Sequence, residues 1–149
     1  NPIADEDGKP FFGDGYEFEY GKVDIVRKGK EVTLVTTGQV THHAVKAADE
    51  LRSQGIEVTV LNVSCPIGAD FDSVKEYLSS TVISLEDHNV NSGLGSILSD
   101  YLVRSRITPK SFEKIGVDRY MFSGDNELLY DLSGLSSKSI VERVRGIIH

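Results

Sequence analysis

The chain has 149 residues, of which 39% are hydrophobic and 26% charged, and its formal net charge is −7. This composition is typical of a globular domain that buries about 70% of the surface exposed by the unfolded chain, so folding needs no disulfide or metal. The acidic charge without a basic stripe argues against nucleic acid as a partner, and the lack of a run of ~20 apolar residues or a signal-peptide pattern predicts a cytoplasmic protein without membrane contact.

Residues 1–20 are rich in turn-forming and acidic residues and contain two of the four prolines of the chain. This composition predicts a linker or arm that arrives from a preceding domain, with the folded domain at residues 21–149. The arm also has too many aromatic side chains for a fully solvated segment, so we expect it to lie against a surface. These aromatic residues are Phe11, Phe12, Tyr16, Phe18 and Tyr20.

From residue 21 onward, runs rich in β-branched residues alternate with apolar residues at helical spacing. Strands are predicted at 23–26, 32–37, 56–63, 81–85 and 112–117. Helices are predicted at 40–51, 71–78, 94–102 and 128–132. A last helix begins after a cap at Ser136 or Ser137 and continues to Ile148.

Strands that alternate with helices favour right-handed crossovers and a parallel sheet covered on both faces. The predicted fold class is α/β: a three-layer α/β/α sandwich with a five-stranded, mostly parallel sheet and one antiparallel edge strand at 23–26. Only the turn Lys28-Gly29-Lys30 separates this strand from the next, so we predict that the two form a hairpin. Ligands and partners of such sheets usually lie beyond the carboxyl ends of the strands.

One segment at that position combines acids, a base and glycines between the strand at 81–85 and the helix at 94–102. Its candidate site residues are Glu86, Asp87, His88, Gly93, Gly95 and Ser96. Unobstructed N–H groups at a helix start favour an anion such as phosphate. The dinucleotide motif is nevertheless incomplete, because Leu98 stands where its third glycine belongs, and the neighbouring acids would repel an anion.

Glycine at a tight turn between strand and helix commonly has a steric cause, so we interpret this segment as an interface loop. Direct ligand contact is the alternative, and Glu86 with His88 as an acid/base pair is a second one. Elsewhere, His42 and His43 cannot face one metal from a helix, because neighbouring residues point about 100° apart. We therefore predict no catalytic residue and no metal ligand in this chain.

Several segments also occur in an order that matches a known family. They are Gly29 to Gly38, Ala44 to Leu51, Glu86-Asp87-His88 with Gly93-Leu94-Gly95-Ser96, Ile115-Gly116-Val117, Ser123-Gly124 with Glu127-Leu128-Leu129, and Gly134-Leu135-Ser136. This succession resembles the C-terminal domain of transketolase over about residues 16–148. The same domain closes 1-deoxyxylulose-5-phosphate synthase and the β subunit of 2-oxo-acid dehydrogenases.

The resemblance implies an enzyme that transfers a two-carbon ketol unit between sugar phosphates with thiamine diphosphate and Mg²⁺. It places both cofactors outside this chain, in preceding cofactor- and pyrimidine-binding domains or in a separate subunit. It also implies that this domain serves assembly and interdomain contacts, is inactive alone and belongs to a homo-oligomer. The alternatives are the equivalent domain of either related enzyme, or a non-catalytic module that binds a phosphorylated small molecule at the turn from Gly93 to Ser96.

Overall fold

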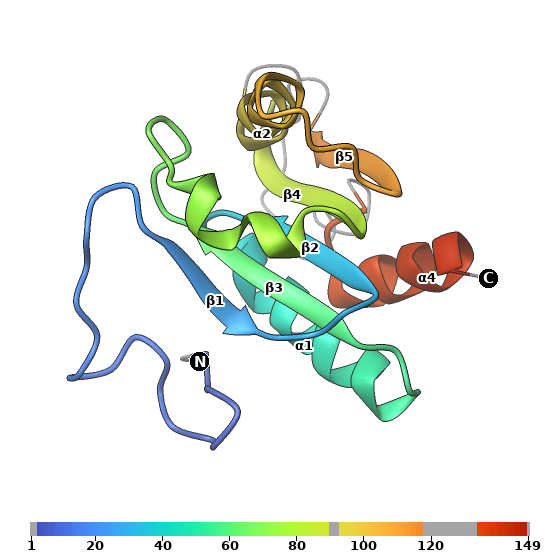
Figure 1. Cartoon of the computed structure of the whole chain (residues 1–149). Helices are drawn as coiled ribbons and strands as arrows, with labels where there is room; N and C mark the ends of the chain where they lie inside the picture. The colour runs from blue at the N-terminus through green and yellow to red at the C-terminus, as the bar shows by residue number, and fades with distance from the viewer. Residues whose placement is uncertain (1–2, 90–92, 118–133, 149) are drawn as a thin grey trace.

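The computed structural model describes residues 3–89, 93–117 and 134–148, which form one five-stranded sheet between two layers of helices (Figure 1). The elements are β1 (Val23–Arg27), β2 (Val32–Thr36), α1 (Val40–Ser53), β3 (Val58–Val63), the 3₁₀ helix η1 (Phe71–Tyr77), β4 (Thr81–Asn89), α2 (Leu94–Arg104), β5 (Ser111–Val117) and α4 (Ser137–Ile148). Helices α1 and α4 cover one face, and η1 and α2 cover the other. The predicted α/β/α sandwich is confirmed.

Two hydrophobic cores lie on the two faces of the sheet, because successive strand residues point to opposite sides. On β2, Val32 and Leu34 pack with α1 and α4, whereas Val35 packs with η1 and α2. On β4, Ile83 and Leu85 face α1. All five β2 residues are buried, as expected for a strand with a helix layer on each side.

The strand order is β1-β3-β2-β4-β5, and three of the four pairings are parallel. Strand β1 pairs with β3 in antiparallel fashion at the edge of the sheet, which confirms the predicted antiparallel edge strand. The predicted hairpin is wrong, because β3 lies between β1 and β2.

The connection from β1 to β2 crosses the beginning of β3 at Gly29. A Cβ built on Gly29 would lie 2.4 Å from the backbone nitrogen of Val58, so only glycine fits there. The Gly29 N–H donates to Thr59 Oγ1 at 2.8 Å, and that hydroxyl donates to the Gly29 carbonyl at 2.7 Å. Residues 28–31 can span the two interstrand spacings of about 10 Å in total, so a short connection does not require a hairpin.

Other predicted elements need smaller corrections. The helix expected at 71–78 is the 3₁₀ helix η1, and Asp70 Oδ1 accepts a hydrogen bond from Ser73 N at its start. Strand β4 continues to Asn89, where it still pairs with β5. Ser136 Oγ accepts a hydrogen bond from Ser139 N and so caps α4 as predicted. The helix expected at 128–132 lies outside the described residues.

Candidate functional site

Glu86, the first candidate site residue, is completely buried beneath the start of α2. It lies on strand β4 on the same face as Val82, which packs in the core under α2. Its Oε1 accepts a hydrogen bond from the N–H of Leu94 at 2.8 Å, and its Oε2 accepts one from the N–H of Gly95 at 2.8 Å. Both bonds and the dipole of α2 offset the cost of burying the carboxylate.

Glu86 therefore acts as the cap of α2 from eight residues upstream. The residue at the cap position, Gly93, has no side chain to donate or accept. The anion that such a helix start favours is thus a carboxylate of the chain itself. Sequence reasoning missed this pairing, although a signal existed: in a strand with alternating faces, position 86 points to the same side as the buried residues 82 and 84.

Gly95 is needed because α2 approaches the sheet very closely at this point. A Cβ built on Gly95 would lie 2.7 Å from Ser84 Oγ and 2.8 Å from Lys114 Cδ. The cause is steric, since Gly95 is not among the glycines with positive φ. Ser84 Oγ is buried and makes no hydrogen bond within the part of the chain that the structure describes.

The other candidate residues lie near the start of α2 that Glu86 caps. Asp87 is half-buried on the opposite face of β4, and a Cβ built on Gly38 would lie 3.9 Å from its Oδ1. Ser96 belongs to the first turn of α2. His88 belongs to β4, but its side chain lies outside the description, so the pairing of Glu86 with His88 stays untested.

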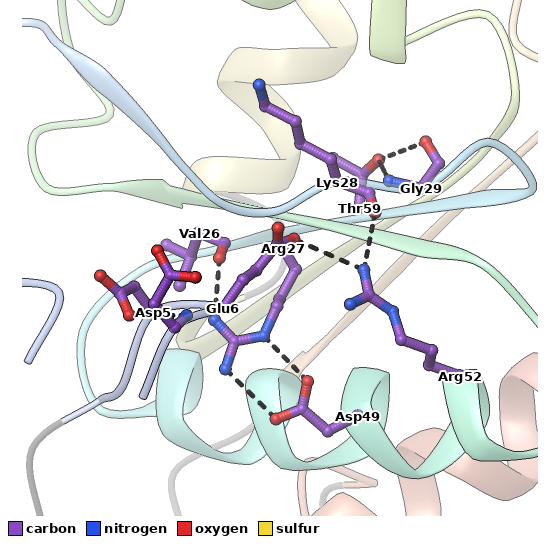
Figure 2. A network of polar contacts seen from close by, with 10 residues as sticks. Asp5, Glu6, Val26, Arg27, Lys28, Gly29, Asp49, Arg52 and Thr59 are labelled. Atoms are coloured by element: carbon purple, nitrogen blue, oxygen red, sulfur yellow. Dashed lines mark hydrogen bonds and ion pairs between the residues drawn. The ribbon is translucent and has the colours of Figure 1, made fainter. Parts of the chain in front are cut away.

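Two arginines attach the edge strand β1 and the arm to helix α1 (Figure 2). Arg27 on β1 is only 6% exposed, and its Nε and Nη2 donate to the two carboxylate oxygens of Asp49 on α1 at 2.8 and 3.2 Å. Arg52, one turn further along α1, lies 3.4 Å from Glu6 Oε1 of the arm. It also donates to the Lys28 carbonyl at 3.1 Å. These contacts hold the arm and the edge strand against one helix.

The aromatic residues of the arm fall into two groups. Tyr16 is half-buried, and its hydroxyl donates to Asp24 Oδ2 at 2.9 Å. Burial and this hydrogen bond to Asp24 raise the pKa of Tyr16 to about 12. Phe18 and Tyr20, in contrast, are 63% and 71% exposed. The arm therefore lies against its own domain through only part of its aromatic side chains.

The described residues do not fit a magnesium-diphosphate site. In residues 3–89, 93–117 and 134–148, no group of three His, Cys, Asp or Glu side chains could hold a metal ion. Asp14, in the Gly-Asp-Gly turn of the arm, is exposed to solvent. None of the helices in these ranges is long and apolar enough to cross a bilayer.

Comparisons with known proteins agree on one relationship. The chain is 35% identical to one subunit of the apulose-4-phosphate transketolase of Actinobacillus succinogenes over 135 residues, which are 87% of this chain and 42% of that protein. It is 34% identical to 1-deoxy-D-xylulose-5-phosphate synthase of Desulfitobacterium hafniense over 128 residues, which are 85% of this chain and 20% of the synthase.

A solved structure, a split-gene transketolase in an inactive beta4 tetramer, superimposes with a TM-score of 0.80 and 29% identity over 91% of this chain and 45% of the other. The chain thus spans less than half the length of the relatives it matches. The model of the family "Transketolase, C-terminal domain" matches residues 21–140. This match covers most of the folded domain, and the chain therefore belongs to the transketolase C-terminal domain family.

Proposed function

We propose that this chain is the C-terminal part of a cytoplasmic transketolase that transfers a two-carbon ketol unit between sugar phosphates. The domain is inactive alone and serves assembly and interdomain contacts within a homo-oligomer. Thiamine diphosphate and Mg²⁺ bind to preceding domains, in the same chain or in a separate subunit, and supply the nucleophilic carbon of the reaction.

The observation that supports the assembly role is the capping of helix α2 by the Glu86 carboxylate. The N–H groups of Leu94 and Gly95 could have held a substrate anion, but they are saturated by a fully buried carboxylate. Proton transfer to substrate also requires a reachable group, and this carboxylate is sealed beneath a helix. Glu86, Gly93 and Gly95 thus give the end of β4 a rigid surface. They do not act as reacting groups.

Two relatives support the placement of the cofactor outside this chain. One is named as a single subunit of a transketolase, and the other is a split-gene transketolase whose beta4 tetramer is inactive. In each of these relatives, the part that matches this chain is less than half of one polypeptide.

The second candidate function is that of the equivalent domain in a 1-deoxyxylulose-5-phosphate synthase. The observation in its favour is the 34% identity to the Desulfitobacterium hafniense synthase, nearly equal to the 35% identity to the apulose-4-phosphate enzyme. The two candidates differ in their product, so an assay of the assembled enzyme separates them.

The test compares the chain alone with the chain assembled with its cofactor-binding partner. Both samples receive thiamine diphosphate, Mg²⁺ and an aldose phosphate acceptor. The donor is a ketose phosphate in one arm and pyruvate, which can supply the deoxy two-carbon unit with loss of CO₂, in the other, and products are identified by mass spectrometry. We expect ketol transfer only from the assembly. Turnover or saturable thiamine diphosphate binding by the chain alone would contradict the proposal, and formation of 1-deoxy-D-xylulose 5-phosphate would support the second candidate instead.

A further inference from the structure

The segment before β1 and the loop after β3 present large apolar side chains to solvent. Because Val23 pairs with Val63 in antiparallel fashion, these two connections lie side by side at one end of the sheet (Figure 1). Tyr20 is 71% exposed and Ile67 is 76% exposed, and the Tyr20 hydroxyl donates to the Ile67 carbonyl at 3.3 Å. Phe18, two residues before Tyr20, is 63% exposed. We refer to Phe18, Tyr20 and Ile67 as the apolar patch.

Close backbone packing holds the apolar patch in one conformation. The Asp70 N–H donates to the Gly21 carbonyl at 2.7 Å. A Cβ built on Gly21 would lie 2.7 Å from the Gly68 carbonyl oxygen, and one built on Gly68 would lie 3.4 Å from Tyr20 Cε1. The two turns therefore fit against each other, and the exposed ring of Tyr20 is fixed on the Gly68 backbone. A side chain that is already ordered loses little entropy on binding, and tyrosine is common among the residues that dominate interfaces.

Acidic side chains lie next to the apolar patch. Glu17 and Glu19 belong to the segment before β1, and Asp70 follows the loop after β3. All three are exposed, and none forms an ion pair within the part of the chain that the structure describes. Lys22, the base of this segment, lies 3.7 Å from Asp24 and so compensates a different carboxylate. The surface is therefore an apolar centre with a negative rim.

We propose that the apolar patch docks the cofactor-binding part of the enzyme, through an apolar recess with Lys or Arg side chains at its rim. This inference rests on the proposed function, in which thiamine diphosphate and Mg²⁺ bind outside this chain. The chain matches less than half the length of its relatives, so the remaining part of the enzyme is large enough to cover this surface.

Two observations favour this occupant over a second copy of the chain. In a C-terminal domain, the rest of the polypeptide arrives through the segment before the first strand, and here that segment carries Phe18 and Tyr20. Two copies that met through the same patch would also bring their negative rims together, which is unfavourable. A basic rim on the partner removes this repulsion and steers the two surfaces toward each other.

Hydroxyl-radical footprinting of the chain alone and of the complete enzyme tests the docking, with oxidation read by mass spectrometry. In the chain alone, Phe18, Tyr20 and Ile67 should be oxidised at a rate that does not depend on protein concentration. In the complete enzyme, oxidation of all three should fall by about fivefold or more, as expected for side chains at the dry centre of an interface. Equal oxidation in both samples would overturn the proposal. Protection of the chain alone at high concentration would overturn it as well, because the occupant would then be a second copy.

Ketol transfer is assayed on the same enzyme sample, which separates this inference from the proposed function. A sample that transfers the ketol unit but leaves Tyr20 fully oxidised refutes the docking surface alone. A sample in which Tyr20 is protected but no ketol transfer occurs supports the docking surface and refutes the proposed function.

One pair of variants tests the apolar centre. Ile67→Asp places a charge in the patch and should return the oxidation of Tyr20 in the complete enzyme to the level of the chain alone. The Ile67 side chain is mostly exposed, so the fold should persist, and circular dichroism checks this. Val103→Asp, at a position of α2 that is also 76% exposed, is the matched control and should leave Tyr20 protected. Continued protection of Tyr20 in Ile67→Asp would contradict the assignment.

A second pair tests the charge of the rim. Reversal of two acids in Glu17→Lys with Glu19→Lys should also expose Tyr20 to oxidation, because like charges would then meet across the interface. Glu50→Lys with Glu142→Lys changes the net charge by the same amount at exposed positions of α1 and α4, and Tyr20 should stay protected. Equal protection in the two double variants would refute the basic rim of the partner.

Discussion

The carboxylate of Glu86 and the backbone N–H of Gly95 lie 2.8 Å apart inside the protein, so a strand residue caps the helix that follows it. The same carboxylate holds Leu94, and α2 therefore begins at a point fixed by the sheet. This arrangement at the start of α2 depends on the charge of Glu86 and on the absence of a side chain at Gly95. These two requirements lead to separate predictions.

Glu86→Gln should lower the free energy of unfolding by about 1–3 kcal/mol, the cost of leaving a buried partner unsatisfied. The amide retains one acceptor oxygen but turns its NH₂ group toward a backbone N–H. Urea denaturation measures the difference. Glu142→Gln, at an exposed position of α4, is the control and should stay within about 0.5 kcal/mol of wild type. Equal stability of both variants would contradict the capping role.

Gly95→Ala should destabilise the protein by about 1–3 kcal/mol, because its Cβ would overlap Ser84 Oγ and the Lys114 side chain. Gly146→Ala is a matched control with the opposite sign, since its Cβ meets nothing within 4 Å and alanine favours the interior of helix α4 by about 1 kcal/mol. The penalty at Gly95 should shrink in a Ser84→Ala background, and thermal unfolding of the four variants tests this coupling.

Tyr16 should make stability fall at high pH. Its pKa is raised to about 12 in the folded state from 10.0, first by burial and then by the hydrogen bond to Asp24. The phenol therefore stabilises the fold fully below pH 10, and this contribution is lost as pH rises from 10 to 12. Ultraviolet titration of the phenolates and unfolding at pH 8 and 11 are the measurements. Tyr16→Phe should abolish that part of the pH dependence, and an unchanged profile would contradict the assignment.

The two arginine contacts of Figure 2 should differ in strength. Asp49→Asn leaves the buried Arg27 guanidinium without its carboxylate and should cost about 1–3 kcal/mol, reduced from a fully buried pair because Asp49 is half exposed. Glu6→Gln breaks a pair in which both side chains are about half exposed and should cost less than about 1 kcal/mol. Urea denaturation at low and high salt compares them; a larger loss in Glu6→Gln would refute this ranking.

His88→Ala should leave the chain folded and act through assembly in the complete enzyme. At saturating cofactor and high protein concentration, turnover should stay within about tenfold of wild type, less than the ~10²–10⁴ typical of a lost general acid or base. Analytical ultracentrifugation of the same samples should show weaker association. A thousandfold loss of turnover in the assembled variant would make His88 catalytic.

The sequence was sufficient to predict the fold class, because the patterns that indicate strands and helices are local in the sequence. The run of β-branched residues from Val32 to Thr37 and the helical spacing of Leu94 and Leu98 can be recognised from residue order alone. The sequence was also sufficient to predict that β1 is an antiparallel edge strand. Its partner could not be predicted, because the choice of β3 over β2 depends on the contact of Gly29 with Val58, which are 29 positions apart.

The candidate site shows the same limit. Its glycines were identified, but the group that occupies the N–H donors was not, since Glu86 was assigned to an interface loop after the strand, with an acid/base pair of Glu86 and His88 only as an alternative. Strand β4 continues through both residues, so alternation places Glu86 under α2.

The crossing at Gly29 also sets an order of events during folding. Strand β1 leaves the ribosome before β3, but its pairing of Ile25 with Leu61 cannot form until β3 has been made. The β2-α1-β3 unit has short sequence separations and can assemble earlier. The N-terminal strand must then close over the unit, with the Gly29 connection folded across the start of β3. Until that step, the outer edge of β3 is an open template for another chain, so the interval before β1 closes is a stage of folding at which aggregation is favoured.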